Sequence, residues 1–133
     1  MIESAEEFVK LRTSEIEEEY SRAANEEASI KVWRDIIHKY PDMKEWVVHN
    51  KTVPSEILEL LSNDEDENVR FSVAMKRKLP EEIQLKLASD TSSSVRERLV
   101  YNKKTTNKVL VVLSNDSNIN IKNEALIRLK DGK

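Results

Sequence analysis

The sequence predicts an all-α protein, an α-α superhelix of short helix pairs that follows an N-terminal helical cap. Two observations predict this fold. The 133-residue chain has one glycine, Gly132, and three prolines, which suits helices joined by short polar turns better than sheets with many tight turns. A pattern of 26 residues also repeats along the chain, and each copy carries apolar residues at helical spacing.

The repeat is clearest in three ungapped copies, which begin at Pro54, Pro80 and Thr106. Four apolar columns recur at this period: Ile57, Ile83 and Val109; Leu61, Leu87 and Leu113; Val69, Val95 and Ile121; Val73, Leu99 and Ala125. A charged pattern recurs with them, an aspartate followed six residues later by a cation: Asp64 and Arg70, Asp90 and Arg96, Asp116 and Lys122. Such self-similarity is typical of stacked repeat units that share one core.

Each copy divides into two helices, which we call helix A and helix B. Pro54 and Pro80 suit the first turn of helix A, where a missing N–H costs nothing. We expect helix A to end near Ser62 and helix B to begin after the polar turn, with Val69 and Val73 facing inward. Helices of about ten residues are marginal alone, so the pairs must stack on their neighbours.

The chain therefore divides into four repeats, at about 28–53, 54–79, 80–105 and 106–131, in one structural domain. The first copy is degenerate and needs a one-residue slip near Tyr40 and Pro41. Residues 1–27 form an acidic capping region, in which Ser4 and Glu7 have the spacing of a capping box. We expect either a helix pair or one bent helix there.

Composition limits the function. No cysteine is present, which excludes disulfides, thiolate catalysis, zinc–thiolate sites and iron–sulfur clusters and fits a reducing cytoplasm. The net charge is −3, but residues 1–30 carry −6 and the rest +3, an asymmetry too mild to indicate nucleic acid. No apolar run approaches the ~20 residues of a membrane span, and the acidic start does not resemble a signal peptide. We expect a cytoplasmic protein without membrane contact.

The segments DEDENVR and DTSSSVR, with Asp followed six positions later by Arg, resemble the HEAT-repeat family and its short bacterial relatives. The period and HNKTVPSEILELLSND are similar to the leucine-rich repeat variant family. The resemblance covers about residues 28–130 and implies a solenoid that binds macromolecules. It also implies a ladder in which each cation bonds an aspartate of an adjacent repeat: Asp64, Arg70, Asp90, Arg96, Asp116 and Lys122. The chain has a shorter period than HEAT repeats and lacks the cluster-binding cysteines of some variant-family members, so no cofactor is expected.

The segment SNDEDENVR also begins like a calcium loop, since Asp64, Asp66 and Asn68 alternate. A calcium loop of this class needs glycine at its sixth position and an acid at its twelfth, where this chain has Val69 and Met75. The next copy has only one acid. We therefore interpret the stretch as a structural turn, with no metal.

Large side chains gather on the outward positions of helix B, opposite its buried columns. A helical wheel places Trp46, His49, Phe71, Met75, Arg98, Tyr101 and Ile127 there. Exposed aromatic, Met and Arg side chains are typical of interface anchors, so we predict that these residues bind a partner. The alternative is that this side packs on neighbouring helices or on the cap.

The ends of helix B are basic, at Lys51, 76–78, 103–104, Arg128 and Lys130. Two interpretations are open: favourable charge at helix C-termini, or a stripe that meets an acidic partner or phosphates. His38 and His49 are eleven residues apart, which is no ligand spacing on one helix face, and no spacing specifies catalysis.

The sequence thus predicts a non-enzymatic protein-binding module, a monomer or weak dimer, of the kind that occludes one partner as an inhibitor or immunity protein does. The alternative is nucleic-acid binding in a basic concave groove, against which the net charge of −3 argues.

Overall fold

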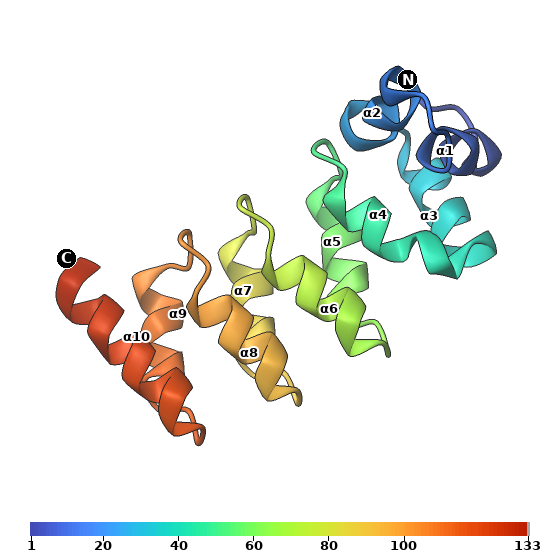
Figure 1. The fold of residues 1–133 in the computed structure, drawn as a ribbon. Coiled ribbons are helices and arrows are strands. Elements are labelled where there is room, and N and C mark those ends of the chain that lie inside the picture. Colours follow the sequence, from blue (N-terminus) through green and yellow to red (C-terminus); the bar gives the residue numbers. More distant parts are fainter. Residues whose placement is uncertain (133) are drawn as a thin grey trace. The chain divides into compact units, whose positions relative to one another are not determined.

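A computed structural model of the chain describes residues 1–132, and this part is all-helical, as predicted (Figure 1). The α-helices are α1 (Ala5–Arg12), α2 (Glu17–Asn25), α3 (Ile30–Lys39), α4 (Lys44–His49), α5 (Ser55–Leu61), α6 (Glu67–Ala74), α7 (Glu81–Leu87), α8 (Ser93–Val100), α9 (Asn107–Leu113) and α10 (Ile119–Gly132). A 3-10 turn, η1 (Pro41–Met43), lies between α3 and α4. The helices follow the expected A and B order, from α3 and α4 in the first repeat to α9 and α10 in the fourth. None of the described helices combines the length and apolar character needed to cross a bilayer.

The described chain forms two compact units, where the sequence predicted one domain. Unit 1 comprises Met1–Leu61, from α1 to α5, and unit 2 begins at Ser62 and holds α6 to α10. The division falls inside the second predicted repeat, between its two helices. Each unit is described below by itself, and the superhelix expected for the whole chain remains a prediction.

In unit 1 the cap is a pair of helices rather than one bent helix. The Ser4 hydroxyl accepts the Glu7 N–H at 3.0 Å, as a capping box requires, but the Glu7 carboxylate accepts the N–H of Glu3 at 2.7 Å instead of that of Ser4. A single parallel bridge joins Ile2 to Ala28, with the Ile2 N–H donating to Glu27. This bridge holds the first residues against the turn before α3.

The core of unit 1 is built on two aromatic rings. Phe8 of α1 and Trp33 of α3 are both fully buried, in an edge-to-face contact with ring centroids 5.7 Å apart. The Trp33 indole N–H finds no acceptor among the described residues. Val47 and Val48 of α4 are buried in the same unit. The cap therefore shares its hydrophobic core with the first repeat.

In unit 2 the B helices α6, α8 and α10 pack side by side in one layer, and the A helices α7 and α9 form a second layer (Figure 1). Every residue of the four apolar columns predicted from the repeat is buried, in both units. The 26-residue period therefore places equivalent side chains at equivalent core positions.

Three local details differ from the sequence predictions. Pro80 is the N-cap residue of α7, one position before the first helical turn, and its carbonyl accepts the first N–H bonds of that helix. Ser72, expected at the edge of the outward side, is buried. The slip near Tyr40 corresponds to η1, which adds a short 3-10 turn where the later repeats have an Asp-capped turn.

Candidate partner-binding surfaces and the ladders that hold them

A ladder of arginines and aspartates joins successive A–B turns of unit 2. Arg70 donates from Nε and Nη2 to the two carboxylate oxygens of Asp90, at 2.8 and 3.2 Å. Arg96 repeats this bidentate pair with Asp116, at 2.8 and 3.3 Å. Hydrogen bonding to Asp90 raises the pKa of Arg70 above its ordinary value. Each arginine thus bonds the aspartate 20 residues further along, in the next repeat, as the resemblance implied.

The same arginines also bond their own turn. Arg70 Nη1 donates to the carbonyl oxygen of Asp64 at 2.7 Å, and Arg96 Nη1 donates to that of Asp90 at the same distance. The ladder does not continue at Lys122, which is exposed and has no bonded partner among residues 1–132. The predicted role of Lys122 is therefore wrong, since its aspartate acceptor would lie one period beyond Asp116, past the last residue.

The aspartates of SNDEDENVR serve as turn caps. The carboxylate of Asp64 accepts the N–H of Asp66 at 3.0 Å, and that of Asp66 accepts the N–H of Asn68 at 2.8 Å. Asp90 and Asp116 cap the following turns in the same way, through Ser92 and Asn118. These carboxylates fix the backbone that leads into helix B. Residues 1–132 contain no group of three or more side chains placed to hold a metal ion.

A second ladder, which the sequence reading missed, runs along the C-terminal ends of the B helices. In unit 2 the buried Asn102 amide donates to the carbonyl oxygens of Ala74 and Lys76, at 2.8 and 2.9 Å. Arg128, 26 residues later, donates to the carbonyl oxygens of Val100 and Asn102. Each side chain satisfies carbonyls that end the preceding B helix.

The same column is occupied in the other copies. In unit 1, Asn50 donates to the carbonyl oxygens of Ala23 and Glu26, so the ladder begins at the cap. Lys76 occupies the remaining position and is half-buried, and burial lowers its pKa. The signal was a recurring spacing of 26 residues with changing residue types, which a search for identical letters overlooks.

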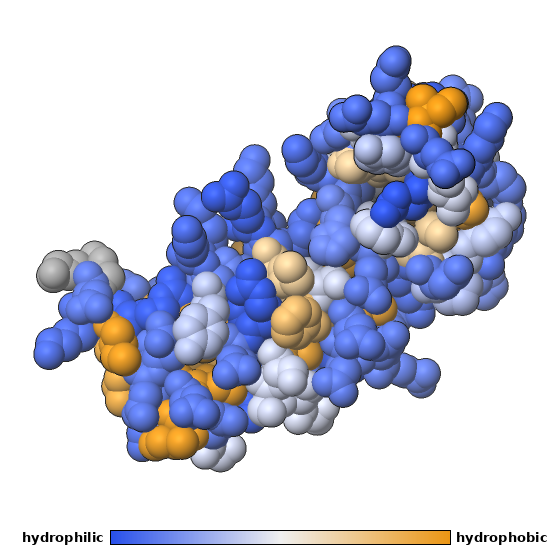
Figure 2. All heavy atoms as spheres, viewed as in Figure 1, coloured by the Kyte–Doolittle hydropathy of each residue, from blue (hydrophilic) through white to orange (hydrophobic). Residues whose placement is uncertain are grey.

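The remaining basic residues of unit 2 gather around a hollow, here called the unit 2 hollow. It has a volume of about 460 Å³ and is lined by Met75, Arg77, Arg98, Tyr101, Asn102, Lys103 and Lys104. Met75 and Tyr101 keep 40% and 52% of their surface exposed. Both lie at the ends of B helices that pack side by side, which brings residues 26 positions apart to one place. Figure 2 shows the mixed hydrophilic and hydrophobic character of one face of the molecule.

The four cationic side chains of the unit 2 hollow, Arg77, Arg98, Lys103 and Lys104, bond no carboxylate in the part of the chain that the structure describes. By contrast, Arg70, Arg96 and Arg128 are all used in the ladders. Grouped like charges without counter-charges repel one another and create a positive local potential. The hollow therefore joins an exposed apolar anchor to free positive charge.

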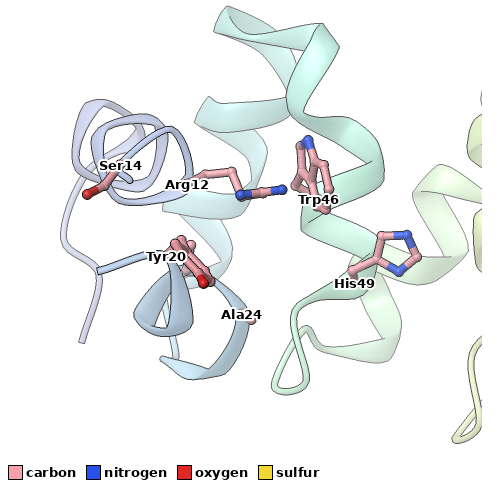
Figure 3. Close-up of a pocket in the computed structure, with 7 residues that line it drawn as sticks. Arg12, Ser14, Tyr20, Ala24, Trp46 and His49 are labelled. Carbon is pink, nitrogen blue, oxygen red and sulfur yellow. The ribbon is translucent and has the colours of Figure 1, made fainter. Parts of the chain in front are cut away.

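Unit 1 presents a different surface, here called the unit 1 pocket. It has a volume of about 440 Å³ and is lined by Arg12, Ser14, Tyr20, Ala23, Ala24, Trp46 and His49 (Figure 3). The guanidinium carbon of Arg12 lies 3.4 Å from the ring centroid of Trp46, a cation–π contact. The ring of His49 is 5.9 Å from that of Trp46. Trp46 thus contacts the cap, as the packing alternative proposed, and is still 41% exposed.

The structure gives each predicted partner-binding residue a position. Trp46 and His49 line the unit 1 pocket, and Met75, Arg98 and Tyr101 line the unit 2 hollow. Phe71 is partly buried and lines neither. Their role in binding stays a prediction. Arg12 and Tyr20 were missed because Tyr20 was assigned to the apolar stripe of the cap, and the contact of Arg12 with Trp46 spans 34 residues.

Comparison of the chain with protein-family models, curated proteins and solved structures gave no match, so its function is inferred from its own residues.

Proposed function

We propose that the chain is a non-enzymatic, HEAT-like helical repeat module that binds another protein through the outward side of its B helices. The occlusion of one partner, as by an inhibitor or immunity protein, is the form of binding that suits so short a module. The partner surface would present acidic side chains around an apolar one.

The unit 2 hollow carries this proposal. Tyr101 and Met75 are exposed anchors, and aromatic residues, Met and Arg are enriched where proteins bind one another. The four surrounding cations have no counter-charge within the described residues, so an acidic partner would supply it. Charge complementarity of this kind favours fast and specific association.

The direct test is site-specific cross-linking. A photoreactive phenylalanine analogue at position 101 should cross-link the partner in extracts of the source cells, whereas the same analogue at Val112 should not. Val112 is a matched control because it is also exposed, at 42%, but lies on the A helix α9. Equal products from both positions would contradict the proposal.

Substitution gives a second test. Tyr101→Ala and Trp46→Ala should abolish or strongly weaken capture of that partner with little loss of thermal stability, since both residues are over 40% exposed. A drop in melting temperature of more than about 10 °C would instead identify them as core residues.

Nucleic-acid binding is the second candidate, favoured by one observation: Tyr101 is exposed beside Arg98 and Lys103, and an aromatic group among cations can stack a base. The test is the affinity for duplex DNA at about 50 and about 200 mM salt. Tight binding with a steep salt dependence would replace the protein-binding proposal, because phosphate contacts release counterions.

A further inference from the structure

We propose that the unit 1 pocket binds a planar aromatic ligand that carries a single carboxylate. This inference goes beyond the proposed function, which the unit 2 hollow carries. The pocket volume of about 440 Å³ lies in the ~300–1,000 Å³ range of small-ligand sites. It is formed by the turn after α1, by α2 and by α4, all within unit 1.

The apolar part of the pocket suits a flat ring. Ala23 and Ala24 have small side chains, which leave space beside α2. Tyr20 from α2 and Trp46 from α4 contribute aromatic rings, each 41% exposed (Figure 3). Aromatic rings favour stacked or edge-to-face contacts with other rings over contacts with flexible chains.

Arg12 supplies the charge. Its guanidinium lies over Trp46 and has no hydrogen bond or ion pair in the described part of the chain. The other two arginines of unit 1 both bond carboxylates: Arg22 bonds Glu7 and Glu26, and Arg34 bonds Glu56. Arg12 is thus unpaired within the most acidic part of the sequence. Contact with the ring leaves the N–H groups of Arg12 available for a bidentate carboxylate.

The remaining polar groups favour a single negative charge. The Ser14 hydroxyl is already used, since it donates to Glu19 at 2.6 Å and accepts the Ile16 N–H at 3.0 Å. The first turn of α2 carries Glu17, Glu18 and Glu19, so the field near the pocket is negative. A multiply charged phosphate would be repelled more strongly than one carboxylate held by Arg12.

The experiment uses indole-3-acetate as the probe, with tryptophol as its neutral analogue and tryptamine as its cationic analogue. The chain has two tryptophans, so ¹H–¹⁵N spectra contain two indole N–H signals, one from Trp46 and one from the buried Trp33. We expect indole-3-acetate to shift the Trp46 signal and to bind about tenfold more tightly than tryptophol, the effect of one charge-assisted hydrogen-bond pair. The Trp33 signal should not move.

Variants test the role of each side. Arg12→Gln should remove the preference for the acid over the alcohol, whereas Arg34→Gln, an equal loss of charge elsewhere in unit 1, should retain it. Trp46→Leu should weaken all three probes, and the unchanged Trp33 signal reports that the variant is folded. Equal affinity of wild type for acid, alcohol and amine, or no shift of the Trp46 signal at about 10 mM indole-3-acetate, would overturn the proposal.

A last comparison identifies the source of the carboxylate. The peptide Gly-Gly-Trp with a free C-terminus, set against its amide, tests a protein C-terminus, and indole-3-acetate tests a free metabolite; tighter binding of one assigns the source. Failure here and failure of the proposed function remain distinguishable. Tyr101→Ala should leave probe binding unchanged, and Arg12→Gln should leave cross-linking from position 101 unchanged.

Discussion

Arg96→Met is the sharpest test of the Arg–Asp ladder. The side chains of Arg96 and Asp116 keep only 15% and 6% of their surface exposed, so the pair is close to the buried limit. The substitution keeps most of the volume but leaves the Asp116 carboxylate with one remaining bond, from the Asn118 N–H, and frees the Asp90 carbonyl.

The expected loss of stability follows from two limits. Breaking one partner of a fully buried pair costs about 3–5 kcal/mol, and breaking an exposed pair costs at most about 1 kcal/mol. With small but real solvent access at Arg96, we expect the free energy of unfolding to fall by about 2–4 kcal/mol. The assay is urea unfolding followed by far-UV circular dichroism, with amide exchange of α9 and α10 to locate the loss.

The matched control is Lys122→Met, at the same position of the next repeat. Lys122 has no bonded partner among the described residues, so its substitution should change the free energy of unfolding by no more than about 0.5 kcal/mol. If Arg96→Met costs no more than Lys122→Met, the ladder does not stabilise unit 2 and the reasoning is refuted.

Three further predictions follow from other contacts. Asn102→Ala should lower the free energy of unfolding by about 1–3 kcal/mol, measured by urea unfolding, because two buried helix-end carbonyls lose their donor; a neutral result would show that water replaces the amide. Tyr101→Phe should leave stability and cross-linking by an analogue at Met75 unchanged, since the hydroxyl has no partner in the described chain, and a loss of partner capture would assign it a bond to the partner. Hydrogen bonding from Arg22 lowers the pKa of Glu26, so this carboxylate contributes stability above its ordinary pKa of 4.5, which is lost as pH falls through the lowered value. The acid limb of a melting-temperature profile should therefore become shallower in Glu26→Gln, and an unchanged limb would contradict this.

The repeat period by itself predicted the core. Residues such as Leu61 and Leu87 are buried because their helical spacing places them on one face, and that spacing depends only on neighbours within the same helix. The turn caps were predicted for the same reason, since Asp64 bonds a backbone group two residues away. The HEAT-like identity of the repeats and their protein-binding role remain proposals.

Tertiary packing decided the candidate sites. Nothing local to Arg12 distinguishes it from Arg22, yet one contacts Trp46 and the other bonds Glu26, because α1 and α4 approach each other in the folded unit. The roles of Arg128 and Asn102 likewise depend on which carbonyls end the preceding helix. Sequence alone determined which side chains face inward, since that is a matter of local geometry. Which outward groups are bonded and which are left for a ligand depends on contacts between segments far apart in the chain, and only the folded structure brings those segments together.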